Sequence, residues 1–274
     1  MHVKSPRLPV VLAIGGHDPG GGAGIQADIE SIGANGCHAA TALTCVTVQD
    51  SCNVSQLVPI PPATLADQIS ATLSDCQVAI IKIGLLGSLP AAEAIVEVLH
   101  KHPTIPVVFD PVLRAGGGGE LANMRLIDYI RQTLIPLCRL ITPNIPEAVK
   151  LTDDNGLPEL DTMGRQLLGL GADAVLITGT HEPDERREIT HYLYQTGASP
   201  IHTSCRRLAG VFHGSGCTLA SAIAARMAAG EALQVAVAQG LEYSWSALTH
   251  GFKTGKCQSI PGRLYRILRH HDER

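Results

Sequence analysis

The residues with the clearest chemical potential lie near position 215, where Gly214-Ser215-Gly216 is followed directly by Cys217. Glycines on both sides of a serine let the backbone turn tightly, so that several N–H groups can point into one small space. The Ala-rich segment that follows is expected to form a helix, whose first N–H groups and positive dipole end also favour an anion. We interpret these four residues as the centre of a phosphoryl-transfer site.

Cys217 is the candidate catalytic group of this site. A thiol at a helix N-terminus beside an anion site should have a pKa lowered from about 8.5 towards neutrality. The sulfur could then accept a proton from an attacking hydroxyl, while the N–H groups nearby hold the phosphoryl charge. The alternative is a buried cysteine that only packs, which is how we interpret the other seven cysteines of the chain.

A second glycine-rich segment, residues 15–24, leads to Asp28. It is a weak match to a dinucleotide-binding loop, because Asp18-Pro19 interrupts the turn and no well-placed acidic residue follows the second strand. It is either a flexible connection or a loop whose backbone approaches a ligand. In the second case the Asp28 carboxylate could bind an amine or hydroxyl group. Gln49, at the next strand end, could bind a heteroaromatic edge or simply be solvated.

Further candidates follow the later apolar runs. Leu85 is either an apolar wall of a ligand site or ordinary core. Asp110 either helps to hold a metal ion or is a buried structural aspartate. Four consecutive glycines, residues 116–119, come shortly after Arg114. They form either a mobile cover, with Arg114 as a phosphate partner, or a disordered surface loop.

Asn144 and Glu147 stand three residues apart at an expected helix start, so that their side chains can meet on one face. Oxygen ligands at this spacing suit Mg²⁺, which takes few protein ligands and keeps several waters. A capping box produces the same spacing for structural reasons. The spacing leaves both interpretations open.

Apolar runs and helical periodicity alternate through the first two-thirds of the chain. This alternation predicts an α/β fold with a mostly parallel sheet, a late antiparallel hairpin and two closing helices. The expected strands are Leu8–Ile14, Ala39–Val48, Val78–Ile83, Val107–Phe109, Leu140–Thr142, Ala174–Thr178, His191–Gln195 and Ile201–Cys205. The expected helices are Gly24–Ala34, Thr64–Asp75, Pro90–His100, Asn123–Leu137, Asp161–Leu170, Cys217–Ala229 and Ala232–Leu248. Without a break in composition, a single domain over residues 1–274 is expected.

Composition limits the function classes. Charged residues make up 17% of the chain and the formal charge is −4, which gives no support for binding nucleic acid or an anionic membrane. We expect no transmembrane helix and no signal peptide. The eight cysteines form no C-x-x-C pair, so neither a zinc site nor a disulfide framework is indicated, and a cytoplasmic protein with reduced thiols is expected. The basic residues from Arg263 to Arg274 are interpreted as a solvated C-terminus.

Together these segments resemble the ribokinase-like superfamily and, more closely, the hydroxymethylpyrimidine/phosphomethylpyrimidine kinases of thiamine biosynthesis. The motifs that carry the resemblance span nearly the whole chain in the family's order: residues 16–28, 82–84, 110–112, 142–148 and 213–219. The resemblance implies a three-layer αβα fold, a homodimer, and the use of ATP and Mg²⁺. It also implies phosphorylation of 4-amino-5-hydroxymethyl-2-methylpyrimidine, and then of its monophosphate to the diphosphate.

The resemblance also implies roles for individual residues. Asp28 and Gln49, with Gly16, would bind the pyrimidine, while Leu85 and Val112 would line its faces. The remaining expected roles are catalysis by Cys217 with an anion hole of Gly214, Ser215 and Gly216, nucleotide or phosphate binding by Asn144, Thr178, Gly179 and Arg114, and metal binding by Glu147 and Asp110.

One departure from the family pattern bears on phosphate binding. Thr178 stands where many members have a lysine thought to contact phosphate, and we expect Arg114 to compensate. Pyridoxal kinases share the scaffold and can share the cysteine, so a vitamin B6 substrate is the nearest rival. A non-catalytic pyrimidine-binding protein is the alternative from another class, and a dinucleotide-dependent oxidoreductase is disfavoured.

Overall fold

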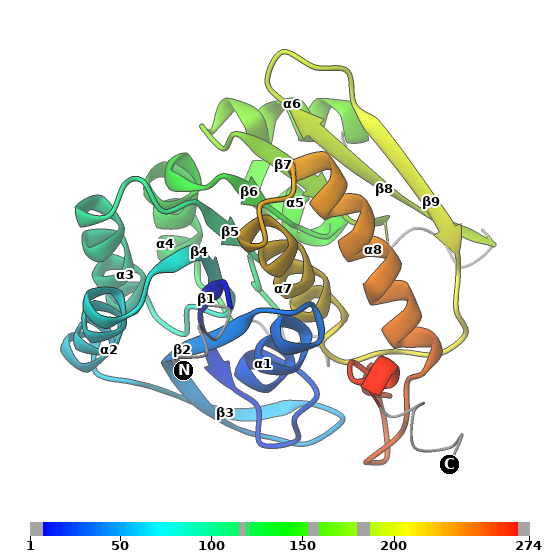
Figure 1. The fold of residues 1–274 in the computed structure, drawn as a ribbon, viewed down its shortest axis with the longest axis horizontal. Coiled ribbons are helices and arrows are strands. Elements are labelled where there is room, and N and C mark those ends of the chain that lie inside the picture. The colour runs from blue at the N-terminus through cyan, green and yellow to red at the C-terminus, as the bar shows by residue number, and fades with distance from the viewer. Residues whose placement is uncertain (1–7, 115–118, 120, 153–158, 180–186, 268–274) are drawn as a thin grey trace, which may run out of the picture.

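The computed structural model describes residues 8–114, 119, 121–152, 159–179 and 187–267 (Figure 1). The strands are β1 (Val10–His17), β2 (His38–Gln49), β3 (Val54–Pro59), β4 (Val78–Ile83), β5 (Val107–Phe109), β6 (Leu140–Ile141), β7 (Ala174–Ile177), β8 (Glu188–Gln195) and β9 (Ile201–Arg206). The helices are α1 (Gly24–Ala34), α2 (Pro62–Asp75), α3 (Leu89–Lys101), α4 (Met124–Tyr129), α5 (Ile145–Thr152), α6 (Leu160–Gly169), α7 (Ser215–Ala228) and α8 (Leu233–Thr249).

These strands form one sheet in the order β3-β2-β1-β4-β5-β6-β7-β8-β9. The six strands from β2 to β7 in this order are parallel, whereas β3 at one edge and β8 and β9 at the other are antiparallel. The predicted parallel sheet with a late antiparallel hairpin is therefore confirmed.

Helices cover both faces of the sheet, because successive residues of its central strands are buried on opposite sides. In β1, Leu12 and Ile14 pack in the core under α2 to α6, while Val11 and Ala13 pack in the core under α1, α7 and α8. Figure 1 shows α1, α7 and α8 gathered over one face of the sheet. The three-layer αβα architecture is thus confirmed; a single domain over the whole chain stays a prediction.

One strand was not predicted, one helix was predicted only at its start, and one predicted helix is interrupted. β3 was missed because most of its residues are exposed and it ends at a proline, so it lacks the apolar signal of a buried strand. The start of α5 was predicted from Asn144 and Glu147, but its extent was not, because prolines flank that start, although proline is well tolerated in a first helical turn. The expected helix over 123–137 is α-helical only as far as Tyr129, and then continues as a π turn and a 3₁₀ turn that contains Pro136.

The order of the strands in the sheet has a topological switch point between β1 and β4. β2 follows β1 on one side, whereas β4 and the later parallel strands extend on the other. Ligands of open α/β sheets bind beyond the carboxyl ends of the strands at such a switch point. None of the described helices is long and apolar enough to cross a membrane.

Candidate active site

Helix α7 packs against β1, β4 and β5, the strands at the switch point and beside it. Gly214 caps this helix with φ = +80°, a left-handed conformation that glycine adopts without strain. The Thr218 N–H donates to the Gly214 carbonyl oxygen (3.0 Å), so the N–H groups of residues 215–217 come before the helical ladder. The predicted anion site therefore lies at a helix N-terminus, and the helix begins at Ser215, two residues earlier than expected.

Beside this helix start lies a set of polar side chains that we call the deep cluster: Asp28, Lys82, Asp110, Cys217 and Ser221. Asp28 Oδ1 accepts hydrogen bonds from Lys82 Nζ (2.7 Å) and from Ser221 Oγ (2.7 Å). The Asp28 and Lys82 side chains are 0% and 1% exposed. Burial acts to lower the pKa of Lys82, but its electrostatic interactions, first with Asp28 and then with Cys217 and Asp110, hold that pKa above its usual value. Lys82 is therefore a fixed positive charge inside the cluster.

Asp110 and Cys217 form the part of the deep cluster nearest the first turn of α7. Burial raises the pKa of Asp110 to about 6 despite the positive charge of Lys82, and the Cys217 thiol hydrogen-bonds to the Asp110 side chain. A Cβ added to Gly216 would lie 3.6 Å from both Asp110 carboxylate oxygens. Asp110 thus lies beside the first turn of α7.

The predicted lowering of the Cys217 pKa is wrong for this structure. Burial raises the pKa of the thiol to about 12, because desolvation outweighs the stabilising charge of Lys82 and the Asp110 and Asp28 carboxylates oppose the thiolate. At neutral pH the sulfur is therefore protonated before a ligand arrives. A thiol in this state can orient a hydroxyl, but it accepts a proton only when the surrounding charges change.

Asp28, expected to bind the substrate amine, lies at the interior end of the deep cluster. Its Oδ2 is buried without a hydrogen-bond partner and would be 3.6 Å from a Cβ on Gly15. The carboxylate therefore sits against the end of β1, with one oxygen engaged by Lys82 and Ser221 and one left over. Its role in substrate binding stays a prediction.

Asn144 and Glu147 form a reciprocal capping box at the start of α5. The Glu147 N–H donates to Asn144 Oδ1 (3.0 Å), and the Asn144 N–H donates to Glu147 Oε2 (3.0 Å). Burial, together with the negative charge of Asp110, raises the pKa of Glu147 to about 8. The structural interpretation of this motif is confirmed, and a role towards a metal or phosphate stays a prediction.

The carboxylates of Asp110 and Glu147, near the start of α5, suit a hard cation such as Mg²⁺. Asp110 Oδ2 is buried without a hydrogen-bond partner, which leaves an acceptor for a metal or its water. Among the described residues, no group of three or more His, Cys, Asp or Glu side chains could hold a metal on its own. This arrangement suits Mg²⁺, because Mg²⁺ takes its other ligands from phosphate oxygens and water.

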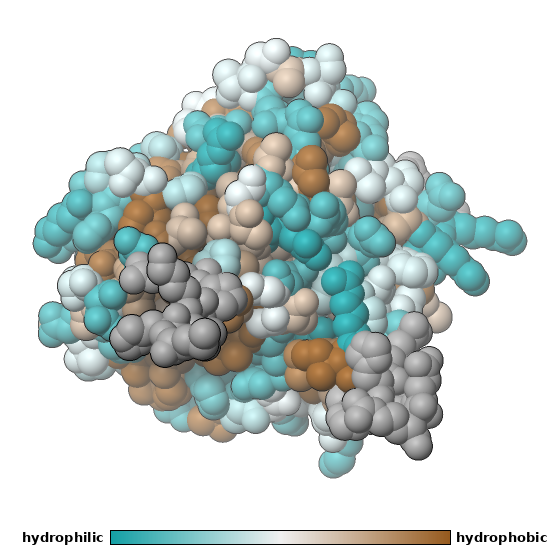
Figure 2. All heavy atoms as spheres, viewed as in Figure 1, coloured by the Kyte–Doolittle hydropathy of each residue, from teal (hydrophilic) through white to brown (hydrophobic). Residues whose placement is uncertain are grey.

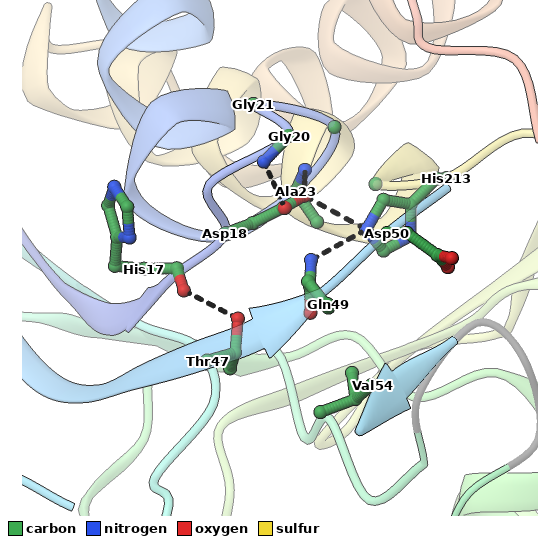
Figure 3. Close-up of polar contacts among 12 residues, drawn as sticks. His17, Asp18, Gly20, Gly21, Ala23, Thr47, Gln49, Asp50, Val54 and His213 are labelled. Carbon is green, nitrogen blue, oxygen red and sulfur yellow. Dashed lines mark hydrogen bonds and ion pairs between the residues drawn. The ribbon is translucent and has the colours of Figure 1, made fainter. Parts of the chain in front are cut away.

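Gln49 belongs to a second group, the rim cluster of Asp18, Gln49 and His213. Figure 3 shows these three side chains pointing toward one another between β2 and the glycine-rich loop. Asp18 Oδ2 lies 3.0 Å from His213 Nε2, and Asp18 also accepts from the N–H groups of Gly20 (2.8 Å) and Ala23 (2.9 Å). Burial would raise the pKa of Asp18, but these hydrogen bonds outweigh it and lower the pKa to about 2.

The predicted apolar walls lie near the carboxyl end of β4. A Cβ added to Gly16 would stand 3.1 Å from Leu85 Cδ2, and Leu85 and Val112 line the same narrow apolar crevice beside Phe109. The structure therefore brings Gly16, Leu85 and Val112 to one region. This crevice has almost no free volume, so a ligand would have to displace part of its lining.

The predicted phosphate-binding residues are only partly placed. Thr178 is buried and pairs with Asn144 across a parallel bridge, in which its N–H donates to the Pro143 carbonyl oxygen (2.9 Å). Gly179 follows directly, also buried. Arg114 is exposed at the end of the described segment, and residues 115–118 of the predicted glycine cover lie outside the described residues.

Three features of the site region were not predicted. Lys82 has an indirect signal, since it is a charged residue inside an otherwise apolar strand. Arg263, placed by us in a solvated tail, is 1% exposed because its guanidinium is fully bonded inside the protein. Cys52 and Cys257 form a disulfide across 205 residues, so the expectation of reduced thiols is wrong for this pair. No spacing rule joins cysteines that only the fold brings together.

A cavity of about 400 Å³ lies beside the rim cluster. Asp18 and His213 line it on one side, and the turn after β2 and the loop before Ile260 line it on the other. The disulfide joins these last two segments, with a Cα–Cα distance of 5.1 Å. A covalent link thus joins two segments of the cavity lining.

Comparisons with known proteins agree with these motifs. The sequence model of the family described as phosphomethylpyrimidine kinase matches residues 18–261. The chain is 38% identical over 240 residues to the thiamine biosynthesis bifunctional protein ThiED of Geobacter sulfurreducens, covering 87% of this chain but only about half (49%) of that protein. It is 36% identical over 253 residues to the hydroxymethylpyrimidine/phosphomethylpyrimidine kinase of Haemophilus influenzae, covering 90% of this chain and 93% of that one.

Among solved structures, an ADP complex of Bacillus subtilis pyridoxal kinase superposes with a TM-score of 0.86. The match covers 95% of this chain and 99% of that chain at 26% identity. The fold is therefore shared with a vitamin B6 kinase, while the higher sequence identities are to the pyrimidine kinases.

Proposed function

Because the chain belongs to the phosphomethylpyrimidine kinase family, we propose that it transfers the γ-phosphoryl group of ATP to 4-amino-5-hydroxymethyl-2-methylpyrimidine. We propose the monophosphate as a second substrate, giving the diphosphate used in thiamine biosynthesis. The observation that carries the proposal is the meeting of Cys217, Asp110 and the N-terminus of α7 at one point. Phosphoryl transfer needs this combination of fixed N–H donors and a group that handles the hydroxyl proton.

In this proposal each group of residues has one role. The N–H groups of residues 215–217 hold the charge of the transferring phosphoryl group. The Cys217 thiol gives up its own proton to solvent once the bound reactants change the surrounding charges, and the resulting thiolate orients the substrate hydroxyl and takes its proton. Gln49 and Asp28 bind the amino group and ring nitrogens of the pyrimidine. Gly16, Leu85 and Val112 surround its faces.

ATP and Mg²⁺ are proposed as the nucleotide and metal. Asp110 and Glu147 would hold Mg²⁺ or its waters, and the ion would neutralise the β- and γ-phosphate oxygens when bound. Asn144, Thr178 and Gly179 lie together at the ends of β6 and β7, where they would bind the phosphate chain. Arg114 would supply the charge that Thr178 does not, so Arg114→Ala should lower turnover much more than nucleotide affinity.

Pyridoxal phosphorylation is the second candidate, favoured by the structural match to a pyridoxal kinase. The choice is tested by measuring ATP turnover with the hydroxymethylpyrimidine and with pyridoxal, repeated with Cys217→Ala. We expect the pyrimidine to give the higher kcat/KM and Cys217→Ala to lower kcat roughly 1000-fold, within the range for loss of a general base. Pyrimidine binding without ATP consumption would instead favour a non-catalytic protein.

We also propose a homodimer and a cytoplasmic location. Exposed valines on β2 and β3 (Val46, Val48 and Val58) support the dimer, since they form an apolar strip at a sheet edge. Figure 2 shows apolar atoms along the lower edge of the molecule, over these strands. Cytoplasmic ATP supply supports the location, whereas the Cys52–Cys257 disulfide is an observation against a strongly reducing compartment.

A further inference from the structure

Arg263 is among the largest fully buried side chains of the described residues, and it arrives from the C-terminal end of the fold. It follows Pro261 and Gly262, and its backbone is held by the Tyr243 hydroxyl, which donates to the Arg263 carbonyl oxygen (2.8 Å). A buried guanidinium needs acceptors for its N–H groups, because unpaired buried charge is strongly unfavourable. The identity of those acceptors indicates what the residue does.

The acceptors belong to the two glycine-rich segments at the proposed active site. Arg263 donates from Nη2 to the Gly22 carbonyl oxygen and from Nη1 to the Gly21 carbonyl oxygen (3.2 Å). Its Nε donates to Thr218 Oγ1 (2.8 Å), and the same hydroxyl donates to the Gly214 carbonyl oxygen (2.8 Å). One side chain therefore connects the loop before α1 to the first turn of α7.

These two segments touch backbone to backbone. A Cβ on Gly214 would collide with the Gly22 carbonyl oxygen and would come within 2.9 Å of Arg263 Nη2. The Gly21 and Gly22 carbonyl oxygens, packed this closely against the first turn of α7, would oppose a phosphate unless a cation bound them. The guanidinium binds these two oxygens directly and reaches the Gly214 carbonyl oxygen through the Thr218 hydroxyl, so it links the two segments.

Helix stability does not account for this arginine. A cation beside a helix N-terminus is disfavoured by the helix dipole, and here Nε bonds within the first turn of α7. The Glu30 carboxylate, 3.0 Å from Nη1, offsets part of that cost. The arrangement is therefore explained better by the position of the N–H groups it supports than by the stability of the helix.

Resting on the proposed function, we propose that Arg263 is a positioning residue for phosphoryl transfer, which holds the Gly21-Gly22 and Gly214 backbones so that the N–H groups of residues 215–217 stay aimed at the transferring group. The bidentate fork of arginine suits this task, whereas lysine could reach only part of the acceptor set. A shift of the site by about 1 Å can cost roughly 100-fold in rate.

The test compares Arg263→Ala and Arg263→Lys with Arg266→Ala, a matched control in which an exposed arginine near the same turn is removed. We expect Arg263→Ala to lower kcat roughly 100-fold with little change in the KM for the pyrimidine. Free guanidinium ion at a non-denaturing concentration should restore part of kcat in Arg263→Ala and in neither other protein. Normal kcat in folded Arg263→Ala, or a loss matched by the unfolded fraction and not restored by guanidinium, would overturn the proposal.

Two further readouts keep the outcome decisive. If Arg263→Ala does not fold, Arg263→Lys decides: a roughly tenfold lower kcat at unchanged KM supports the proposal, and wild-type kcat overturns it. Amide hydrogen exchange should rise at residues 20–24 and 213–217 in the Arg263 variants and not in Arg266→Ala. Amide hydrogen exchange can be measured without enzyme activity. Unchanged exchange in the Arg263 variants would therefore overturn the positioning role of Arg263, whereas a wild-type protein without kinase activity would overturn the proposed function.

Discussion

The deep cluster and the rim cluster lie at the same end of the sheet, yet they differ in how fully the protein hydrogen-bonds their carboxylates. In the rim cluster, Asp18 accepts hydrogen bonds from two backbone N–H groups and pairs with His213. In the deep cluster, Asp28 and Asp110 each keep one buried oxygen without a hydrogen-bond partner. The pKa of Asp18 falls to about 2, whereas the pKa of Asp110 rises to about 6.

This difference distinguishes a carboxylate that stabilises the fold from carboxylates that are available to a ligand. A carboxylate whose two oxygens are both bonded within the protein mainly stabilises the loop that carries it. A buried oxygen without a partner costs stability and persists where a substrate, metal or water completes it. From this comparison we expect the rim cluster mainly to shape the loop before α1, and the deep cluster mainly to contact the reactants.

The sharpest test of the deep cluster is removal of its positive charge. Lys82→Met leaves the Asp28 carboxylate buried without its cation, and we expect a loss of about 4 kcal/mol in the free energy of unfolding, measured by urea denaturation. The double variant Lys82→Met/Asp28→Asn should recover much of this loss, because it removes both charges. A single variant as stable as the wild type would show that the pair is not an energetic unit.

The rim cluster should show its effect in the acid range. The pKa of Asp18 is lowered on folding, so its stabilising contribution is complete above about pH 4 and is lost as the pH falls towards 2. We expect Asp18→Asn to cost about 2 kcal/mol at pH 7 and to flatten the loss of stability between pH 4 and pH 2. Thermal unfolding across this pH range measures both, and an unchanged acid profile would contradict the assignment.

The smallest expected effect concerns Gln49, the one rim residue with a predicted substrate contact. Losing a hydrogen bond to a ring edge should raise the KM for the pyrimidine roughly tenfold, about 1.4 kcal/mol, with little change in kcat. Gln56 on β3, which is exposed, is a matched control for Gln49→Ala. A fall in kcat at constant KM would instead place Gln49 with the groups that act on the transition state.

Much of the fold could be predicted because its elements are regular. The six parallel strands carry apolar runs between helices with clear periodicity, and the hairpin of β8 and β9 was found from its turn residues. β3 carried too little apolar signal, since only tertiary pairing with β2 makes it a strand. Local patterns therefore gave the sheet except where the partner strand decided the structure.

The site could be predicted only as far as local motifs reach. The glycine-rich segments and the Asn144–Glu147 cap were visible in short windows of sequence. The state of Cys217 was not, because its pKa depends on burial and on three charged groups from other elements. Arg263 was missed for the same reason, since its acceptors lie more than forty residues away in the sequence.

The disulfide between Cys52 and Cys257 turns most of the chain into a covalent ring. A protease that cuts once anywhere between these two cysteines opens the ring without separating the pieces, so the nicked protein would still migrate as one species until a thiol reagent is added. The two glycine-rich segments of the proposed active site differ in this respect: residues 15–24 lie outside the ring and residues 213–217 lie inside it. Their contact through Gly22 and Gly214 is therefore a junction between a free arm of the polypeptide and a closed loop.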